Sequence, residues 1–325
     1  MEDREMDKKA LPRIVIMYGG VGAEREISLI SGKAVLDALK GYRGLPVIPV
    51  ELKTDQLPKK INPATDIVLP VLHGQFGEDG AMQQELEDAG IVFCGSDARS
   101  SALCMNKART KALLEENGVP VVAGLSCDKD LELSAGEIVS MLGPSIVAKP
   151  VGMGSSIGLQ LLDGAEQIAR FIREKDEQFG GWLLEQRIFG REFSVGILHG
   201  KAMGVVEIVV PEGRVYDYEQ KYYRDDTDYQ CPANIDLHVA DELQHYAERA
   251  FAICGCRDYA RVDFLWDQRT DCRSCLELNT IPGMTPTSLL PKSAGAVGLD
   301  FEGLLLKMME PAIARFRERM TARNG

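Results

Sequence analysis

The hydrophobic positions of the chain form short apolar runs separated by segments of helical spacing. In the N-terminal part, apolar runs predict strands at residues 13–18, 47–50, 66–72 and 91–94. Helical spacing lies between them, at residues 24–39 and 81–89. Strands that alternate with helices in this way are typical of an α/β sheet. We therefore expect an α/β domain at the start of the chain.

The same two patterns continue through the rest of the chain. Helical spacing recurs at residues 102–114 and 240–254. Further apolar runs predict strands at residues 145–149, 182–188, 191–198 and 262–266. The last helical pattern, at residues 301–319, contains Pro311, which has no backbone N–H to donate. We expect a kink or break of that helix near Glu310.

Two of the N-terminal strands are followed by glycine-rich turns. Gly20-x-Gly22 opens onto a helix, but Arg25 stands where a dinucleotide-binding fingerprint has its third glycine, so that fingerprint is excluded. Glu24 at the start of the helix is better suited to an ammonium group. His73 follows residues 66–72, at the strand end where open α/β sheets bind ligands. A capping or packing histidine is the alternative.

A lysine close to the end of an apolar strand indicates an anion site. Lys149 ends residues 145–149, and a lysine on such a strand is costly unless it meets an anion. Residues 151–158 follow as a loop of glycines and serines, whose N–H and O–H groups suit phosphate. Because the lysine precedes the glycines, this is not a P-loop.

Two strands near the C-terminus carry hard oxygen ligands. Glu277 and Asn279 are two residues apart, so on a strand they project from the same face. A polar turn at residues 267–273 connects them to the strand that contains Asp263. Pairing of the two strands would place Asp263 beside Glu277, and such oxygen donors suit magnesium. The sequence therefore predicts a metal-nucleotide site here.

Composition limits the possible partners and location. The chain has 325 residues, which favours two or three domains, and a net charge of −12. An acidic chain without a basic block argues against a nucleic-acid surface. No apolar run approaches the roughly 20 residues of a membrane helix, and residues 1–10 lack an apolar signal core. We expect a cytoplasmic protein without a membrane partner.

The cysteines allow two interpretations. Buried thiols are the ordinary state of cysteine in a cytosolic protein. Four of the eight nevertheless have the spacing of zinc ligands: Cys254, Cys256, Cys272 and Cys275.

A polar and aromatic segment at residues 216–228 fits neither the helical nor the strand period. Such a segment is either a surface excursion or a lid over a site.

Five motifs occur in order along the chain. They are Gly19-Gly-x-x-Ala-Glu-Arg-Glu-Ile-Ser28, His73-Gly-x-x-Gly-Glu-Asp-Gly80, Lys149-Pro-x-x-x-Gly-Ser-Ser-x-Gly158, Tyr216-Asp-Tyr-Glu-x-Lys-Tyr222 and Glu277-x-Asn-Thr-x-Pro-Gly-Met-Thr285. Together they resemble the D-alanine–D-alanine ligases of the ATP-grasp superfamily. One motif alone is weakly specific, whereas five in the family's order are highly specific. Gly22 departs from the family, because many relatives have serine there.

The resemblance implies an α/β protein with an ATP-grasp fold preceded by a Rossmann-like domain. The expected domains are residues 1–98, which bind the first D-alanine, and two ATP-grasp subdomains at residues 99–186 and 187–325. The implied reaction joins two D-alanines for peptidoglycan synthesis, with ATP as co-substrate and an acyl phosphate as intermediate. The resemblance also implies a homodimer.

It further implies roles for individual residues at the first substrate and at ATP. Glu24 would bind the ammonium group of the first D-alanine, beside His73, and Ser155 and the lid residue Tyr222 would join its hydrogen-bond network. Contacts to the ATP phosphates would come from Lys107, Lys149, Ser156 and Lys221. Adenine and ribose would be seated by Glu185, Gln186, Ile188 and Glu192.

The remaining implied roles lie on the C-terminal strands and the loop after them. Two magnesium or manganese ions would be bound by Asp263, Glu277 and Asn279. Arg261 and the Gly283 N–H would stabilise the tetrahedral oxyanion. Ser288 and Leu289 would hold the carboxylate of the second substrate.

Three alternatives compete with this interpretation. A sister ligase would join D-alanine to D-lactate or D-serine, although the lysine–tyrosine pair ending at Tyr222 is of the D-alanine type. A nucleotide-binding regulator without catalysis would not need the oxyanion arginine, Arg261. A nicotinamide oxidoreductase is disfavoured by the interrupted glycine fingerprint.

Overall fold

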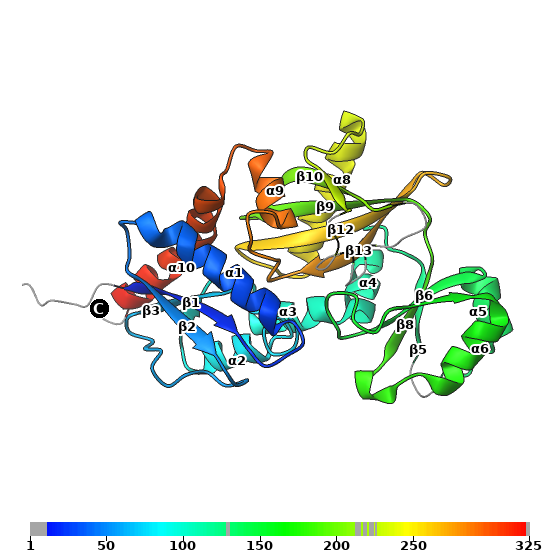
Figure 1. Cartoon of the computed structure of the whole chain (residues 1–325), viewed down its shortest axis with the longest axis horizontal. Helices are drawn as coiled ribbons and strands as arrows, with labels where there is room; N and C mark the ends of the chain where they lie inside the picture. Colours follow the sequence, from blue (N-terminus) through cyan, green and yellow to red (C-terminus); the bar gives the residue numbers. More distant parts are fainter. Residues whose placement is uncertain are drawn as a thin grey trace, which may run out of the picture.

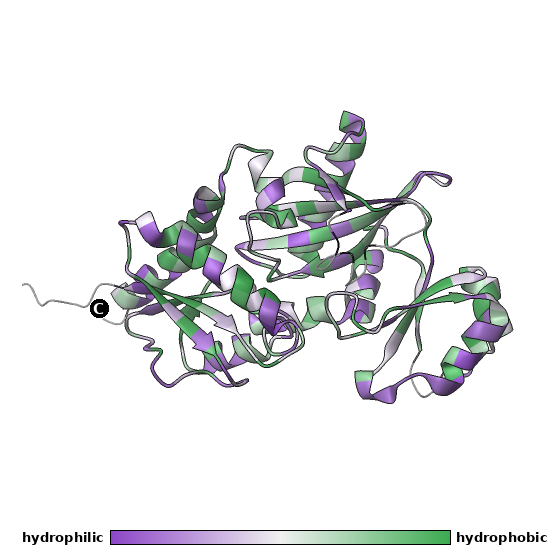
Figure 2. Cartoon of the chain, viewed as in Figure 1, coloured by the Kyte–Doolittle hydropathy of each residue, from purple (hydrophilic) through white to green (hydrophobic). Residues whose placement is uncertain are grey.

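The computed structural model describes residues 12–127, 131–211 and 226–322, together with Tyr216, Gln220 and Arg224. It contains three sheets, which Figure 1 shows as three lobes along the molecule. Figure 2 shows hydrophobic residues concentrated on the strands and hydrophilic residues on the outer helices, as expected where each sheet carries its own core.

The first sheet is parallel and has the order β2-β1-β3-β4. Its strands are β1 (Arg13–Gly19), β2 (Val47–Leu52), β3 (Asp66–Pro70) and β4 (Val92–Phe93). Helix α1 (Arg25–Ala38), extended by the 3₁₀ turn η1 (Leu39–Gly41), packs on one face, and α2 (Ala81–Asp88) packs on the other. The predicted N-terminal α/β arrangement is confirmed.

The second sheet is antiparallel, with the order β11-β10-β9-β12-β13. Its strands are β9 (Arg191–Leu198), β10 (Lys201–Val209), β11 (Asp228–Gln230), β12 (Tyr259–Asp267) and β13 (Cys272–Asn279). Helix α8 (Leu237–Ile253) packs on one side through Leu243 and Ala247. Helix α9 (Leu289–Gly295) follows the loop after β13.

The third sheet is also antiparallel, with the order β5-β8-β6-β7. Its strands are β5 (Gly124–Cys127), β6 (Ser145–Pro150), β7 (Gln160–Asp163) and β8 (Trp182–Gln186). Helices α5 (Ala135–Leu142) and α6 (Gly164–Glu174) cover its outer face, and the 3₁₀ turn η2 (Glu177–Phe179) precedes β8. Only a short connection at residues 187–190 leads from β8 to β9 in the second sheet.

The helix predicted at residues 102–114 is two helices, α3 (Ala98–Met105) and α4 (Lys107–Glu116). Asn106 lies between them with an extended backbone, and its side chain accepts a hydrogen bond from the Arg109 N–H. Asparagine favours such N-terminal caps because its side chain replaces a missing backbone acceptor. The cap starts a new helix and fixes the position of Lys107.

The break predicted at Pro311 is wrong, because α10 (Phe301–Ala322) is one continuous helix. Proline removes the hydrogen bond to the carbonyl four residues earlier, that of Lys307. Here His199 Nε2 lies 2.7 Å from the Lys307 oxygen and replaces the missing donor. Buried residues of α10, including Met308 and Phe316, pack against the first sheet. None of the helices in the described ranges is long and apolar enough to cross a membrane.

Candidate active site

Strands β12 and β13 bring the predicted metal ligands together. Asp263 pairs directly with Glu277, and Arg261 pairs with Asn279. The Asp263 carboxylate accepts hydrogen bonds from Arg261 Nε at 2.9 Å, Ser194 Oγ at 2.7 Å and Asn279 Nδ2 at 3.2 Å. The predicted pairing of the hairpin is confirmed.

The donor set of this strand pair fits a magnesium or manganese ion. Two carboxylates and an amide oxygen are hard ligands, and magnesium in nucleotide sites takes one or two carboxylates together with phosphate oxygens. No three histidine, cysteine, aspartate or glutamate side chains form a metal-holding group among the residues that the structure describes. Phosphates would therefore have to complete the coordination.

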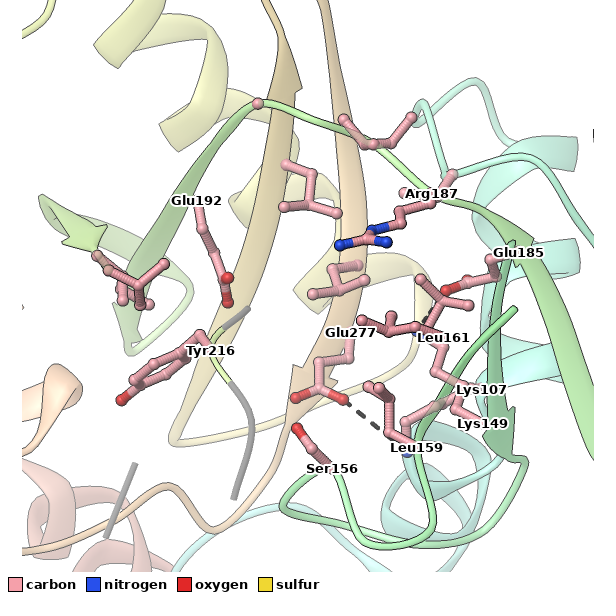
Figure 3. Close-up of a pocket in the computed structure, with 18 of the residues that line it drawn as sticks. Lys107, Lys149, Ser156, Leu159, Leu161, Glu185, Arg187, Glu192, Tyr216 and Glu277 are labelled. Atoms are coloured by element: carbon pink, nitrogen blue, oxygen red, sulfur yellow. Dashed lines mark ion pairs between the residues drawn. The ribbon is translucent and has the colours of Figure 1, made fainter. Parts of the chain in front are cut away.

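A cavity of about 270 Å³ lies between the second and third sheets. It is lined by seven of the predicted ATP residues: Lys107, Lys149, Ser156, Glu185, Gln186, Ile188 and Glu192. Apolar walls come from both sheets, for example Leu161 on one side and Leu265 on the other. Figure 3 shows Lys107, Lys149 and Glu277 at one end and Arg187 extending into the cavity. The predicted Lys221 lies outside the described residues.

The glycine- and serine-rich loop at residues 151–158 contacts the start of α4. Lys107 Nζ donates to the Met153 carbonyl at 2.6 Å and lies 3.8 Å from Glu277 Oε2. Ser155 and Ser156 both have positive φ, at 50° and 57°, which is uncommon for residues other than glycine. The Ser155 hydroxyl donates to Glu24 in the larger cavity, whereas Ser156 lines the smaller one.

Lys149 is buried and forms an ion pair with Glu185. Lys149 Nζ lies 2.5 Å from Glu185 Oε2, and Glu185 is 2% exposed. Burial lowers the pKa of Lys149 to about 7, and the like charge of Lys107 contributes in the same direction. A second buried lysine, Lys111, contacts the other oxygen of Glu185.

A larger cavity, of about 610 Å³, lies where the first sheet meets the second. Nine predicted residues line it: Glu24, His73, Ser155, Arg261, Glu277, Asn279, Gly283, Ser288 and Leu289. Glu277 and Tyr216 line both cavities, so the two spaces meet at these side chains. Asp263 lines neither, because it lies behind Arg261 and Asn279.

One end of the larger cavity is acidic. Glu24 is 5% exposed and accepts a hydrogen bond from Ser155 Oγ. Gly154 lets the loop approach this carboxylate closely, since a Cβ at this position would lie 3.2 Å from Glu24 Oε2. A buried carboxylate beside a serine hydroxyl suits a substrate ammonium group.

His73 lines the same cavity as Glu24 and is held from both sides. Its Nδ1 is 3.1 Å from Glu78 Oε1, and its Nε2 is 3.3 Å from Ser31 Oγ. Burial raises the pKa of Glu78. Because His73 lines the cavity, the ligand-side interpretation fits the structure better than a packing role alone.

The opposite end of the cavity is formed by the loop before α9. Ser288 Oγ lies 2.8 Å from Thr285 Oγ1 and 3.1 Å from the Thr285 N–H. A Cβ at Gly283 would lie 3.0 Å from Ser288 Oγ, which explains the glycine. The predicted Tyr222 falls outside the described residues.

Several residues that the structure places at the site have no role predicted from the sequence. Lys111 is four residues after Lys107, a helical spacing that puts both on one face and could have indicated a shared role. Glu78 stands inside the second motif, but only the fold brings it to His73. Arg187 carries no signal in its spacing.

The four cysteines considered as zinc ligands do not converge. Cys272 is exposed and contacts Ser274, whereas Cys254 and Cys256 are buried beside Cys104. Burial on packed elements explains Cys254, Cys256 and Cys275 as ordinary core thiols.

Comparison with known proteins agrees with this geometry. Residues 113–310 match the family model of the D-Ala–D-Ala ligase C-terminus. The chain is 38% identical to a D-alanine–D-alanine ligase of Mannheimia succiniciproducens, covering 92% of this chain and 97% of the relative. A ligase of the same name from Haemophilus influenzae is 39% identical over 91% of this chain and 99% of its own. The chain belongs to the D-alanine–D-alanine ligase family.

Solved structures extend the likeness to the fold. A D-alanine–D-alanine ligase of Bacillus anthracis complexed with ATP has a TM-score of 0.81 at 26% identity, covering 95% of this chain and 99% of that one. The VanG D-Ala:D-Ser ligase of Enterococcus faecalis has a TM-score of 0.80 at 28% identity, covering 93% and 99%. The ligase family member described here therefore has the ATP-grasp fold expected from its motifs.

Proposed function

We propose that this ligase joins two D-alanine molecules to D-alanyl-D-alanine and converts ATP to ADP and phosphate, for peptidoglycan synthesis. The observation that carries the proposal is that Glu277 lines both the smaller cavity, which contains Lys107 and Lys149, and the larger cavity, which contains Glu24 and Arg261. Chemistry that passes from a nucleotide to an amino acid needs two such adjoining spaces. The printed names of the relatives support the same reaction.

In the first step a carboxylate oxygen of the first D-alanine attacks the γ-phosphorus of ATP. The bond from that phosphorus to the β–γ bridging oxygen breaks, ADP leaves, and an acyl phosphate forms. Glu24 binds the ammonium group of this substrate, beside His73, with Ser155 and Tyr222 in its network. Contacts to the phosphates come from Lys107, Lys149, Ser156 and Lys221, and the nucleoside is seated by Glu185, Gln186, Ile188 and Glu192.

In the second step the neutral amine of the second D-alanine attacks the acyl carbon. Arg261 and the Gly283 N–H stabilise the oxyanion of the tetrahedral intermediate, where fixed donors act most strongly. Ser288 and Leu289 hold the second carboxylate. Collapse of the intermediate breaks the carbon–oxygen bond to phosphate and completes the peptide bond.

Two magnesium or manganese ions would be held by Asp263, Glu277 and Asn279. When bound, they would neutralise charge on the ATP phosphates. We also propose the domain division at residues 1–98, 99–186 and 187–325, a cytoplasmic location and a homodimeric assembly, as the family resemblance implies.

A second candidate is a ligase with D-serine or D-lactate as acceptor. The likeness to the VanG D-Ala:D-Ser ligase is the observation that favours it. Competition between D-alanine, D-serine and D-lactate, with the products separated by mass, distinguishes the acceptors. We expect D-alanyl-D-alanine to predominate.

The reaction is tested by ADP release with D-alanine present or absent and with magnesium present or absent. ADP release that requires both, together with a product of the mass of D-alanyl-D-alanine, is the expected result. ATP binding without D-alanine-dependent turnover would instead favour a regulator.

A further inference from the structure

Behind the nucleotide cavity, one carboxylate is shared by two lysines. Glu185 ends β8 and is 2% exposed, with Lys149 Nζ 2.5 Å from Oε2 and Lys111 Nζ in contact with Oε1. Lys149 lines the cavity, whereas Lys111 stands behind Glu185, outside that lining. Lys111 is itself 6% exposed, so its ammonium group is removed from water.

The charges of this group do not cancel. Lys107 and Glu277 lie 3.8 Å apart at the cavity and balance each other. If Glu185 paired with Lys149 alone, the two charges would balance in the same way. The carboxylate would then neutralise Lys149, and its charge would not be available to a ligand. Burial lowers the pKa of Lys111 well below its ordinary value, and the contact with the Glu185 carboxylate opposes this by favouring the charged form. In that form Lys111 adds one positive charge to the pair, which acts strongly on its buried neighbours.

The helix that carries Lys111 also places a phosphate-side lysine. Helix α4 starts at its Asn106 cap, so Lys107 reaches the Met153 carbonyl in the glycine loop. Lys111 follows one turn later and reaches Glu185 from the same face. One short helix thus connects the glycine- and serine-rich loop at residues 151–158 to Glu185, the ion-pair partner of Lys149.

We propose that Lys111 is a positioning residue, which shares the Glu185 carboxylate and thereby keeps the charge of Lys149 available to the phosphates of a nucleotide. The inference rests on the proposed function only for the identity of the nucleotide. A buried ion pair seldom adds stability over an apolar packing of equal volume, so stability alone gives no reason for a third charged group.

The test is direct binding of ATP and of adenosine, by calorimetry without D-alanine, to the full-length protein and its Lys111→Met variant. We expect ATP binding about tenfold weaker in the variant, because Glu185 then pairs with Lys149 alone and the charge of Lys149 acts less on the phosphates. Adenosine, which has no phosphates, should lose much less affinity than ATP, although Glu185 also seats the nucleoside. The KM for ATP should rise more than kcat falls, and Lys111→Arg should restore most of the affinity. Arg109→Met removes the same charge from the exposed face of α4 and is the matched control, with no change expected.

A double-mutant cycle tests whether Lys111 acts through Glu185. In a Glu185→Gln background, Lys111→Met should cause little further loss of ATP affinity. The proposal is overturned by unchanged ATP affinity in Lys111→Met, by equal loss for ATP and adenosine, or by an undiminished effect in the Glu185→Gln background. If the methionine variant does not fold, Lys111→Gln carries the same measurements. Wild-type protein that binds ATP but makes no dipeptide would refute the proposed function and leave this binding test valid.

Discussion

Glu277 lies where the two cavities of the site meet. It lines both cavities, pairs with Asp263 across the hairpin, and lies 3.8 Å from Lys107. A residue in this place can act on the phosphate side and the amino-acid side at once. The neighbouring Asp263, the other carboxylate of the proposed metal site, accepts hydrogen bonds from Arg261 and Asn279 in the structure.

Changing Glu277 to glutamine should nearly abolish turnover. Loss of a direct carboxylate ligand should lower kcat/KM by at least ~100-fold, the upper end of what partners outside the ligand shell cost. It should also raise the magnesium concentration needed for half-maximal rate. Steady-state kinetics over a magnesium titration measure both. Glu116→Gln, on an exposed position, is the control, and near-normal activity of Glu277→Gln would contradict the metal assignment.

The Asp66 carboxylate makes the free energy of unfolding depend on pH in the acid range. Burial alone would raise the pKa of Asp66, but hydrogen bonds from Arg13, Asn62 and Thr65 lower it overall. A carboxyl whose folded pKa is below its unfolded value of about 3.9 stabilises the fold above that pH and loses this effect as pH falls through the folded pKa.

Asp66→Asn should therefore flatten the decline in unfolding free energy below about pH 4. Urea unfolding between about pH 3 and pH 7 measures it. Asp55→Asn, at an exposed position, should leave the decline in place. If the unfolding free energy of Asp66→Asn fell with pH as steeply as that of the wild type, the Asp66 carboxylate would not be the cause of the decline.

At the scale of elements, His199 and Pro311 form a pair across two segments of the chain. The histidine supplies the hydrogen bond to the Lys307 carbonyl that proline cannot. His199→Ala should lower the unfolding free energy by about 1 kcal/mol, the usual net value of a hydrogen bond.

The matched experiment restores the missing donor. Pro311→Ala returns a backbone N–H to α10, so His199→Ala should cost less in that background. Chemical denaturation of the wild type, His199→Ala, Pro311→Ala and the double variant gives the four unfolding free energies of the cycle. An equal cost in both backgrounds would mean that His199 acts in another way.

Individual elements differ in how far the sequence could predict them. The β12–β13 hairpin was predictable, because two apolar runs flank a polar turn and its oxygen ligands are two residues apart. The division between α3 and α4 was not, since helical periodicity continues through Asn106 and only its cap interrupts it. The continuity of α10 depended on His199, more than a hundred residues away in sequence.

At the scale of the whole molecule, the last helix returns to the first sheet. Figure 1 shows α10 beside β3 at the N-terminal lobe, and its buried side chains share a core with Ile14 and Leu69. Arg315 donates to both oxygens of Asp258, at 2.7 and 2.6 Å, and to the Phe93 carbonyl at 2.9 Å. Sequence periodicity identifies the apolar face of such a helix but not the sheet that it covers.

Arg315→Met should destabilise the protein by about 1–3 kcal/mol, because the buried Asp258 carboxylate loses its charged partner. Thermal unfolding measures the loss, and Arg317→Met on the exposed face of α10 is the control. Equal melting temperatures for Arg315→Met and wild type would show that packing alone holds the helix.

In the proposed reaction, an amino-acid carboxylate in the larger cavity receives a phosphoryl group beside Glu277 before the peptide bond forms. Reaction with D-alanine labelled with ¹⁸O in its carboxylate tests this most directly, with phosphate and dipeptide both analysed by mass. We predict one ¹⁸O in each released phosphate and one in the peptide carbonyl. Phosphate without label, formed together with the dipeptide, would contradict the account.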